Sequence, residues 1–175
     1  MIKLRTATLQ DAAFVKELYD YYILNTVHTF NEEPKPLEHY IAEIQSTLPK
    51  YPFIIAELDN KPVGFACAEP FRMQSGYRYS AECTIYLSPT APKRQGIGKL
   101  LYTSLCKELT KRGYVNAIGV VSGENLPSIK MHKGLGFEII ATFKNSAYKL
   151  GRWLDTIIMV KELNKPTVPP VQPFN

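Results

Sequence analysis

The sequence predicts a single α/β domain built on a mixed sheet with helices around it. Its 175 residues suffice for one domain that buries its own core. Stretches with helical and with strand periodicity alternate along the chain, which is typical of α/β proteins. Three strand-like segments follow one another between residues 53 and 87, which indicates hairpins. The strand-like segment 115–121 follows a helical one and is expected to lie parallel to its predecessor.

The first 48 residues predict one strand and two helices. Residues 2–7 alternate apolar and polar side chains, as a half-buried strand does. Residues 10–25 and 37–48 carry apolar side chains at helical spacing. The inner faces of these helices are expected to carry Phe14, Leu18, Tyr21, Tyr22, Tyr40, Ile41, Ile44 and Leu48. The segment between them holds two prolines and predicts a loop.

The middle of the chain predicts three strands and a long helix. The strands cover 53–58, 63–70 and 79–87, and polar segments rich in turn-forming residues separate them. The helix covers 97–112, and Gly113 follows its end. Its buried face is expected to carry Ile97, Leu100, Leu101, Leu105 and Leu109.

The rest of the chain predicts a buried strand, a short helix, two strands and a tail. The short helix is expected to start near Gly123, with Pro127 in its first turn. The final strands cover 137–149 and 152–163. Residues 164–175 hold four prolines, so they are expected to form an extended or disordered tail outside the domain of residues 1–163.

Composition and charge argue against several classes of protein. The net charge is +5, but the basic residues are scattered, which argues against nucleic-acid binding. This charge suits an anionic cofactor or simply a solvated basic surface. No apolar run is long enough to span a membrane, and residues 1–5 lack the apolar core of a signal peptide. Cys67, Cys83 and Cys106 are widely spaced, which predicts reduced core thiols in a cytoplasmic protein without a metal site.

A glycine pair after the third strand of the hairpin series is typical of a loop that holds a pyrophosphate. Gly96 and Gly98 let the backbone approach a ligand closely. The helix that opens near Ile97 points free N–H groups and the positive end of its dipole at the loop. The spacing matches neither a P-loop nor the dinucleotide fingerprint, because Leu101 replaces the third glycine. The polar residues around the glycines are Lys93, Arg94, Gln95 and Lys99.

This loop in its strand–helix context resembles the acetyl-CoA loop of the GNAT superfamily of N-acetyltransferases, although Lys93 stands where the superfamily usually has Arg or Gln. The order of predicted elements over residues 1–163 is similar to the GNAT fold, a mixed, mostly antiparallel sheet flanked by helices. Several further blocks resemble small bacterial phosphinothricin and methionine sulfone or sulfoximine N-acetyltransferases: Tyr51-Pro52, Glu82 to Leu87, Leu100-Leu101-Tyr102, the Asn125, Ser128, His132 and Phe137 series, and Tyr148 to Asp155.

The resemblance implies acetyl-CoA as cosubstrate, no metal, and a small amine as acceptor. It also implies a homodimer. Backbone groups of Ile85, Tyr86 and Leu87 are expected to contact the cosubstrate, together with the loop from Lys93 to Lys99. The resemblance implies that Asn125 contacts the pantetheine arm of the cosubstrate and that Ser128 belongs to the same binding site. Both residues also suit an N-cap pair, and the two roles are compatible.

Glu82 is the candidate general base. An amino-acid amine is mostly protonated at neutral pH, so a base must take its proton before it attacks. Apolar residues flank Glu82 in its strand, and desolvation would raise the pKa of its carboxyl toward a useful range. The alternative is a strand-edge glutamate paired with a nearby Arg or Lys. A covalent route through Cys83 is less favoured, because no activating histidine is placed beside it by the sequence.

His132 is the second catalytic candidate. It follows Asn125 by seven residues, so both side chains project from one face of the short helix. A histidine can donate a proton to the departing thiolate or bind the acceptor. The alternative is a histidine that only forms hydrogen bonds within the fold.

The acceptor contacts are expected in the loop after the second strand of the hairpin series. An arginine fork suits an amino-acid carboxylate, although solvated surface arginines are an equal alternative. The candidates are Arg72, Ser75, Gly76, Tyr77 and Arg78. Other interpretations of the whole chain are acetylation of a protein N-terminus, a polyamine or an aminoglycoside, or a non-catalytic acyl-CoA-binding module.

Overall fold

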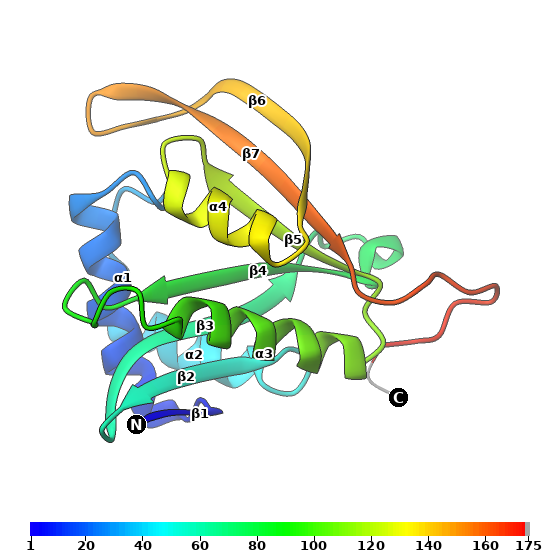
Figure 1. The fold of residues 1–175 in the computed structure, drawn as a ribbon, viewed down its shortest axis with the longest axis horizontal. Coiled ribbons are helices and arrows are strands. Elements are labelled where there is room, and N and C mark those ends of the chain that lie inside the picture. The colour runs from blue at the N-terminus through cyan, green and yellow to red at the C-terminus, as the bar shows by residue number, and fades with distance from the viewer. Residues whose placement is uncertain (174–175) are drawn as a thin grey trace.

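The computed structural model describes residues 1–173, which form one seven-stranded sheet with helices on both faces (Figure 1). The strand order is β1-β2-β3-β4-β5-β7-β6. The strands are β1 (Ile2–Thr6), β2 (Phe53–Leu58), β3 (Lys61–Pro70), β4 (Ser80–Leu87), β5 (Asn116–Ser122), β6 (Glu138–Lys149) and β7 (Arg152–Glu162). The helices are α1 (Ala12–Asn25), α2 (Leu37–Thr47), α3 (Ile97–Lys111) and α4 (Leu126–Gly134), with short 3-10 turns at Leu9–Asp11 and Ser75–Tyr77.

Strands β4 and β5 form the one parallel pair of this described sheet, as the sequence predicted. They pair over three residues only, from Ser80 opposite Asn116 to Glu82 opposite Ile118. Beyond that point the strands diverge toward their C-terminal ends (Figure 1). All the other neighbouring strands pair antiparallel, which confirms the mixed, mostly antiparallel sheet.

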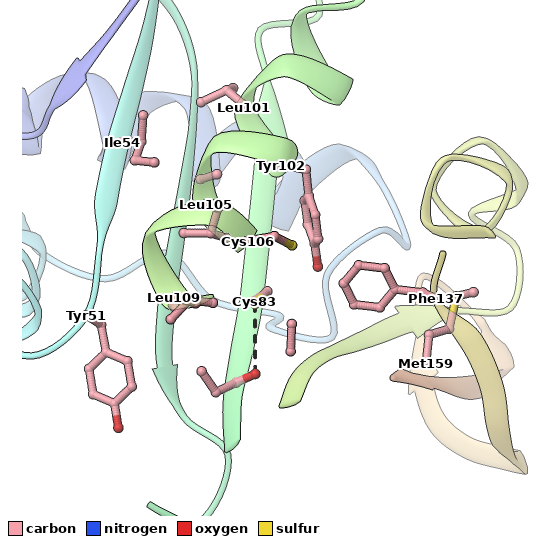
Figure 2. Close-up of a cluster of buried hydrophobic side chains, with 14 of the residues drawn as sticks. Tyr51, Ile54, Cys83, Leu101, Tyr102, Leu105, Cys106, Leu109, Phe137 and Met159 are labelled. Carbon is pink, nitrogen blue, oxygen red and sulfur yellow. Dashed lines mark hydrogen bonds between the residues drawn. The ribbon is translucent and has the colours of Figure 1, made fainter. Parts of the chain in front are cut away.

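Helices α3 and α4 cover one face of the sheet, and α1 with α2 cover the other (Figure 1). Figure 2 shows the core under α3, where Leu101, Leu105 and Leu109 recur at helical spacing and are fully buried. Burying each such leucine stabilises the fold by roughly 1.5–3 kcal/mol. A second core forms between the sheet and α1 and α2, and it includes Tyr40, Phe53 and Phe65.

The prediction that two helix residues are buried is wrong. Tyr21 of α1 is 40% exposed and Leu100 of α3 is 45% exposed. Both lie at the edge of an apolar stripe, where helical spacing alone does not decide which side chain reaches the sheet. Helix α4 begins at Leu126, three residues after the predicted start, because Asn125 caps it.

Residues 164–173 contain no helix or strand, and side chains near both ends of this segment form hydrogen bonds with the domain. The Asn164 side chain donates hydrogen bonds to the carbonyls of Thr110 and Tyr114 at 3.0 and 2.7 Å. The Gln172 side chain donates to the Tyr79 hydroxyl at 2.8 Å. The last two residues of the predicted tail, 174 and 175, lie outside the described residues.

The described residues include no helix with the length and apolarity that a membrane crossing requires. Cys67, Cys83 and Cys106 are buried and free, as predicted.

Candidate active site

The divergence of β4 from β5 opens a cleft between the two strands. Residues 83–87 of β4 have no pairing partner on β5, so their backbone groups on that side, apart from the Leu87 carbonyl that accepts from Tyr22, are open to a ligand. Helix α4 and the start of α3 close the cleft on one face of the sheet, and α1 with its following loop closes it on the other. The lining residues are Tyr22, His28, Glu82 to Leu87, Gly98, Val120, Val121, Asn125, Pro127, Ser128, Met131 and His132.

Glu82 lies at the last paired position of β4, at the base of this cleft. Its side chain is half-buried. Burial and, to a smaller extent, the negative charge of Glu69 raise the pKa of its carboxyl to about 7, against an opposing effect of Arg72. A carboxyl with this pKa can accept a proton near neutral pH, as the sequence analysis expected. Neither ion pairing nor a side-chain hydrogen bond holds Glu82 to another described residue, so the alternative of a paired structural glutamate has no support here.

His132 is 2% exposed, and both of its ring nitrogens have partners within the fold. Nδ1 lies 2.8 Å from the Ser128 carbonyl oxygen and Nε2 lies 2.9 Å from the Tyr102 hydroxyl. The carbonyl can only accept, so Nδ1 carries the hydrogen and Nε2 accepts from Tyr102. Burial lowers the pKa of His132, which keeps this ring neutral. These contacts favour the alternative of a histidine that acts within the fold, and a role as acid or acceptor ligand stays a prediction.

Gly119 of β5 makes room for the His132 ring. A Cβ at this position would lie 2.7 Å from Nε2, closer than real contacts allow. The ring therefore packs on the α3 side of the sheet, whereas Glu82 alternates with Cys83 and points to the side of α1 and α2. Cys83 lies on the α3 side, and burial raises the pKa of its thiol well above the usual value. A thiol that stays protonated at neutral pH does not support the covalent route.

Asn125 caps the N-terminus of α4. Its Oδ1 accepts a hydrogen bond from the Ser128 backbone N–H at 3.2 Å, and Pro127 lies in the first turn. Both Asn125 and Ser128 line the cleft, so the expected contacts with the cosubstrate are sterically open to them.

The glycine loop lies at the N-terminus of α3, beside the cleft. Gly96 has φ of +74°, a left-handed conformation that favours glycine, and it is the N-cap of the helix. Gly98 lines the cleft, and a Cβ there would lie 3.3 Å from the side chains of Leu87 and Met131. Ile97 is buried. Four other residues of this loop were predicted to contact the cosubstrate. Their side chains are exposed and do not line the cleft: Lys93, Arg94, Gln95 and Lys99.

The residues predicted to contact the acceptor are not gathered at the cleft. Arg72, Ser75, Gly76, Tyr77 and Arg78 are all exposed, and none of them lines it. The guanidinium of Arg72 stacks on Phe71 at 4.6 Å from the ring centre, and that of Arg78 lies 5.4 Å from the centre of Tyr79. Of the five, only Arg72 acts on Glu82 electrostatically. Their role in acceptor binding stays a prediction.

Residues 4–158 match the family described as Acetyltransferase (GNAT) domain. The chain belongs to the GNAT acetyltransferase family. It is similar over 98% of its length to a phosphinothricin N-acetyltransferase of Streptomyces viridochromogenes, with 30% identity and 94% of that protein covered. It is 28% identical to an L-methionine sulfoximine/L-methionine sulfone acetyltransferase of Salmonella typhimurium, with 95% and 97% of the two chains covered.

Solved structures give the same assignment. A GNAT superfamily phosphinothricin acetyltransferase from Sinorhizobium meliloti, determined in complex with acetyl-CoA, aligns with a TM-score of 0.91 at 33% identity. The alignment covers 99% of this chain and 98% of that one. An N-acetyltransferase from Staphylococcus aureus aligns with a TM-score of 0.90 at 27% identity, over 94% and 99% of the two chains. The fold is therefore the GNAT fold that the sequence predicted.

This GNAT acetyltransferase is an acetyl-CoA-dependent enzyme, and the residues of its cleft fit that cosubstrate. The unpaired backbone of β4 can bind an amide-containing arm, and the glycine loop and helix start suit a pyrophosphate. The exposed basic side chains around the loop complement phosphate charge. Acetyl-CoA supplies the activated acetyl group.

Sequence reasoning missed several contacts that build the surroundings of the cleft. Tyr102 was recognised only as part of a motif, and its bond to His132 spans 30 residues of sequence. Tyr22 donates a hydrogen bond to the Leu87 carbonyl at 2.8 Å, which ties α1 to the end of β4. The loop that carries His28 is held by buried Lys149, whose Nζ donates to the Thr29 carbonyl at 2.9 Å. No local pattern predicts such contacts between distant segments.

Proposed function

We propose that the enzyme acetylates the amino group of a small amino-acid-like acceptor of the phosphinothricin, methionine sulfone or methionine sulfoximine class. The observation that carries the proposal is Glu82, a half-buried carboxyl with a pKa of about 7 at the base of the cleft. The relatives named for these acceptors support the substrate class, since they match nearly the whole chain.

In the proposed reaction Glu82 takes one proton from the acceptor's ammonium group, directly or through a water molecule. The free amine attacks the carbonyl carbon of the thioester, a C–N bond forms, and the C–S bond breaks. The sulfur leaves with the electron pair as a thiolate, which is a good leaving group because the pKa of a thiol is only about 8.5. The nitrogen then loses its second proton, which the thiolate takes up directly or through water, so the products are a neutral amide and free CoA thiol. Direct transfer needs no nucleophile from the protein, which agrees with the protonated state of Cys83.

The cleft walls orient the reactants in this proposal. Backbone N–H groups among Ile85, Tyr86 and Leu87 stabilise the thioester oxygen as it gains charge. The glycine loop from Lys93 to Lys99 binds the pyrophosphate, and Asn125 with Ser128 contacts the pantetheine arm. His132 joins α4 to α3 through its bond to Tyr102, and its ring packs against Gly119 of β5.

The test is release of free CoA thiol from acetyl-CoA with a panel of amines: methionine sulfone, methionine sulfoximine, phosphinothricin, a polyamine and a peptide. Turnover is expected with the first three, and Glu82→Gln is the matched control that keeps the shape of the side chain. Turnover with the polyamine or peptide alone would contradict the acceptor class. Acetyl-CoA binding without any turnover would favour a non-catalytic binding module.

A cationic acceptor such as a polyamine is the second candidate, and one observation favours it. Three carboxylates from distant segments, Glu43, Glu69 and Glu82, lie close enough for their charges to interact. The sequence contains no acidic run besides Glu32-Glu33 that would predict this cluster, because its three members come from α2, β3 and β4. The polyamine arm of the panel tests this candidate.

We also propose that the enzyme is a homodimer that works in the cytoplasm. Support for a dimer comes from edge strand β6 and its partner β7, which expose many large apolar side chains. These are Ile139, Ile140, Phe143, Tyr148, Leu150 and Trp153. The three free, buried cysteines support a reducing compartment.

Sedimentation at micromolar concentration tests the dimer. Phe143→Lys places a charge in the exposed apolar set and is expected to shift the protein to monomer. Lys93→Glu, on the far glycine loop, is the control for a change of surface charge and leaves the dimer intact. A monomeric wild-type protein would contradict the proposal.

A further inference from the structure

Strands β3 and β4 place two glutamates opposite each other. Glu69 is the direct partner of Glu82 in the antiparallel ladder between these strands. Direct partners point to the same face of a sheet, with Cβ atoms about 5 Å apart. That face is the one under α1 and α2, since Phe65 and Cys67, which lie four and two residues before Glu69 and so share its face of β3, belong to the core there.

The glutamate pair has no neutralising ion pair. Among residues 1–173, no cation lies within salt-bridge distance of either carboxylate, and neither forms a side-chain hydrogen bond. Like charges directly opposite each other destabilise a strand pair, so a purely structural role does not account for this arrangement. Glu69 is open to solvent at the end of β3, whereas Glu82 is half-buried at the cleft.

Few other charges act on Glu82. The titratable groups around it, besides Glu69, are Arg72 after β3, Glu43 of α2, Cys83 of β4, Tyr102 of α3, and Tyr22 and His28 at the cleft wall. Strand β5 contributes the apolar Ile118 opposite Glu82. His132 of α4 lies on the other face of the sheet. Glu69 and Arg72 are therefore the two charged residues that shift the pKa of Glu82, Glu69 upward and Arg72 downward.

We propose that Glu69 is a positioning residue for the acetyl transfer, because its negative charge on the neighbouring strand keeps a proton on Glu82 up to a higher pH. The inference rests on the proposed role of Glu82 as base. An anion beside a carboxyl disfavours the loss of its proton. A base with a higher pKa accepts a proton from an ammonium group more readily, so Glu69 makes Glu82 a stronger base. Because Glu82 then keeps its own proton up to a higher pH, the acetylation rate at acidic pH is lower.

The first measurement titrates the Glu82 carboxyl by NMR in the full chain, with carbon-13 at the side-chain carboxyls of its glutamates. The Glu82 signal is the one that disappears in Glu82→Gln. Glu69→Gln is expected to move its midpoint to lower pH by about 0.5 to 1 unit, since water at the exposed Glu69 screens the interaction. Arg72→Gln is expected to move the midpoint the other way.

Glu43→Gln is the matched control. It removes a carboxylate that interacts with Glu69 and is not among the groups that shift Glu82. It is expected to move the Glu82 midpoint by less than half of the shift in Glu69→Gln. An unchanged Glu82 titration in Glu69→Gln overturns the inference.

The second measurement follows thiol release with methionine sulfone between about pH 5 and 9. In Glu69→Gln the acid limb of kcat/KM is expected to move to lower pH by the NMR shift, which from a pKa of about 7 gives roughly 3- to 5-fold more activity at pH 6 relative to the plateau. Ionisation of the acceptor amine is common to both proteins and cancels. A rise in KM with an unmoved acid limb overturns the inference, because Glu69 would then contact the acceptor.

The two measurements separate this inference from the proposed function. The NMR titration needs neither acetyl-CoA nor an acceptor. If Glu69→Gln shifts the Glu82 titration and no amine is acetylated, the coupling of the two glutamates stands and the proposed function fails.

Discussion

At the residue scale, the chemistry depends on one carboxyl whose proton affinity the fold has changed. Glu82 is a charged residue of β4 between two buried residues, Ala81 and Cys83. Burial is the largest cause of the raised pKa of its carboxyl. The apolar neighbours are visible in the sequence, which is why Glu82 could be predicted. Its partner Glu69 could not, because the pairing of β3 with β4 decides which residue lies opposite.

Glu82→Gln is expected to cut turnover at least tenfold at neutral pH, while acetyl-CoA affinity holds. The amide keeps the shape of the side chain and cannot accept the proton. In the wild-type enzyme the acid limb of kcat/KM is expected to have its midpoint near pH 7, where half of the Glu82 carboxyls have lost their proton. Thiol release across pH measures both, and normal turnover in the variant would rule out the assigned base.

The same substitution is expected to change how stability depends on pH. The pKa of Glu82 is raised from 4.5 to about 7 in the folded state, so the folded protein binds this proton more tightly than the unfolded chain. The resulting stabilisation is complete below pH 4.5 and is lost as pH rises through 7. Glu82→Gln should therefore gain in Tm relative to wild type as pH rises over this range. Thermal unfolding at several pH values measures it, and a constant difference would contradict the raised pKa.

Gly119→Ala is expected to displace the His132 ring, because the added methyl group would lie 2.7 Å from Nε2. The loss of its hydrogen bond with Tyr102 and the strain should lower the free energy of unfolding by about 1–3 kcal/mol. Denaturant unfolding measures this. Tyr102→Phe removes the same hydrogen bond without the clash, so a larger loss in Tyr102→Phe than in Gly119→Ala would contradict the steric cause.

At the scale of elements, the cleft depends on where pairing stops. The sequence predicted most helices and strands within two residues, because periodicity and turn residues are local. It could not predict that β4 and β5 pair over three residues and then separate. The apolar run of β4 reads simply as core, and its separation from β5 was expected only through family resemblance.

Gly96→Ala is expected to weaken acetyl-CoA binding, because φ of +74° costs a residue with a Cβ about 1 kcal/mol or more. The strain should distort the N-terminus of α3, where the pyrophosphate is proposed to bind. Calorimetric titration with acetyl-CoA measures the affinity. Gly134→Ala is the control, since its site is open and its φ is not left-handed. Equal affinities of the two variants would contradict the role of the glycine loop.

At the scale of the whole molecule, the tail and the hairpin of β6 and β7 extend the domain beyond its catalytic cleft. The tail is fixed by Asn164, which joins it to the end of α3 and the start of the next segment. These partly buried hydrogen bonds hold the start of the tail to the domain, whereas residues 165–172 are exposed.

Asn164→Ala is expected to lower the free energy of unfolding by about 1–3 kcal/mol, because the carbonyls of Thr110 and Tyr114 lose their partly buried donor. Gln172→Ala, which removes an exposed bond to Tyr79, is expected to cost less. Denaturant unfolding compares them. A cost of Gln172→Ala equal to that of Asn164→Ala would contradict the anchoring role assigned to Asn164.

The α/β class, the order of the elements, the glycine loop and the candidate base can be predicted from the amino-acid sequence, because each depends on residues close together in the chain. Which groups meet depends on the fold. It gave His132 its partners Ser128 and Tyr102, left Arg78 away from the cleft, and placed Glu69 beside Glu82. The reason is physical: proton affinity and access are set by burial and by charges that only folding brings together.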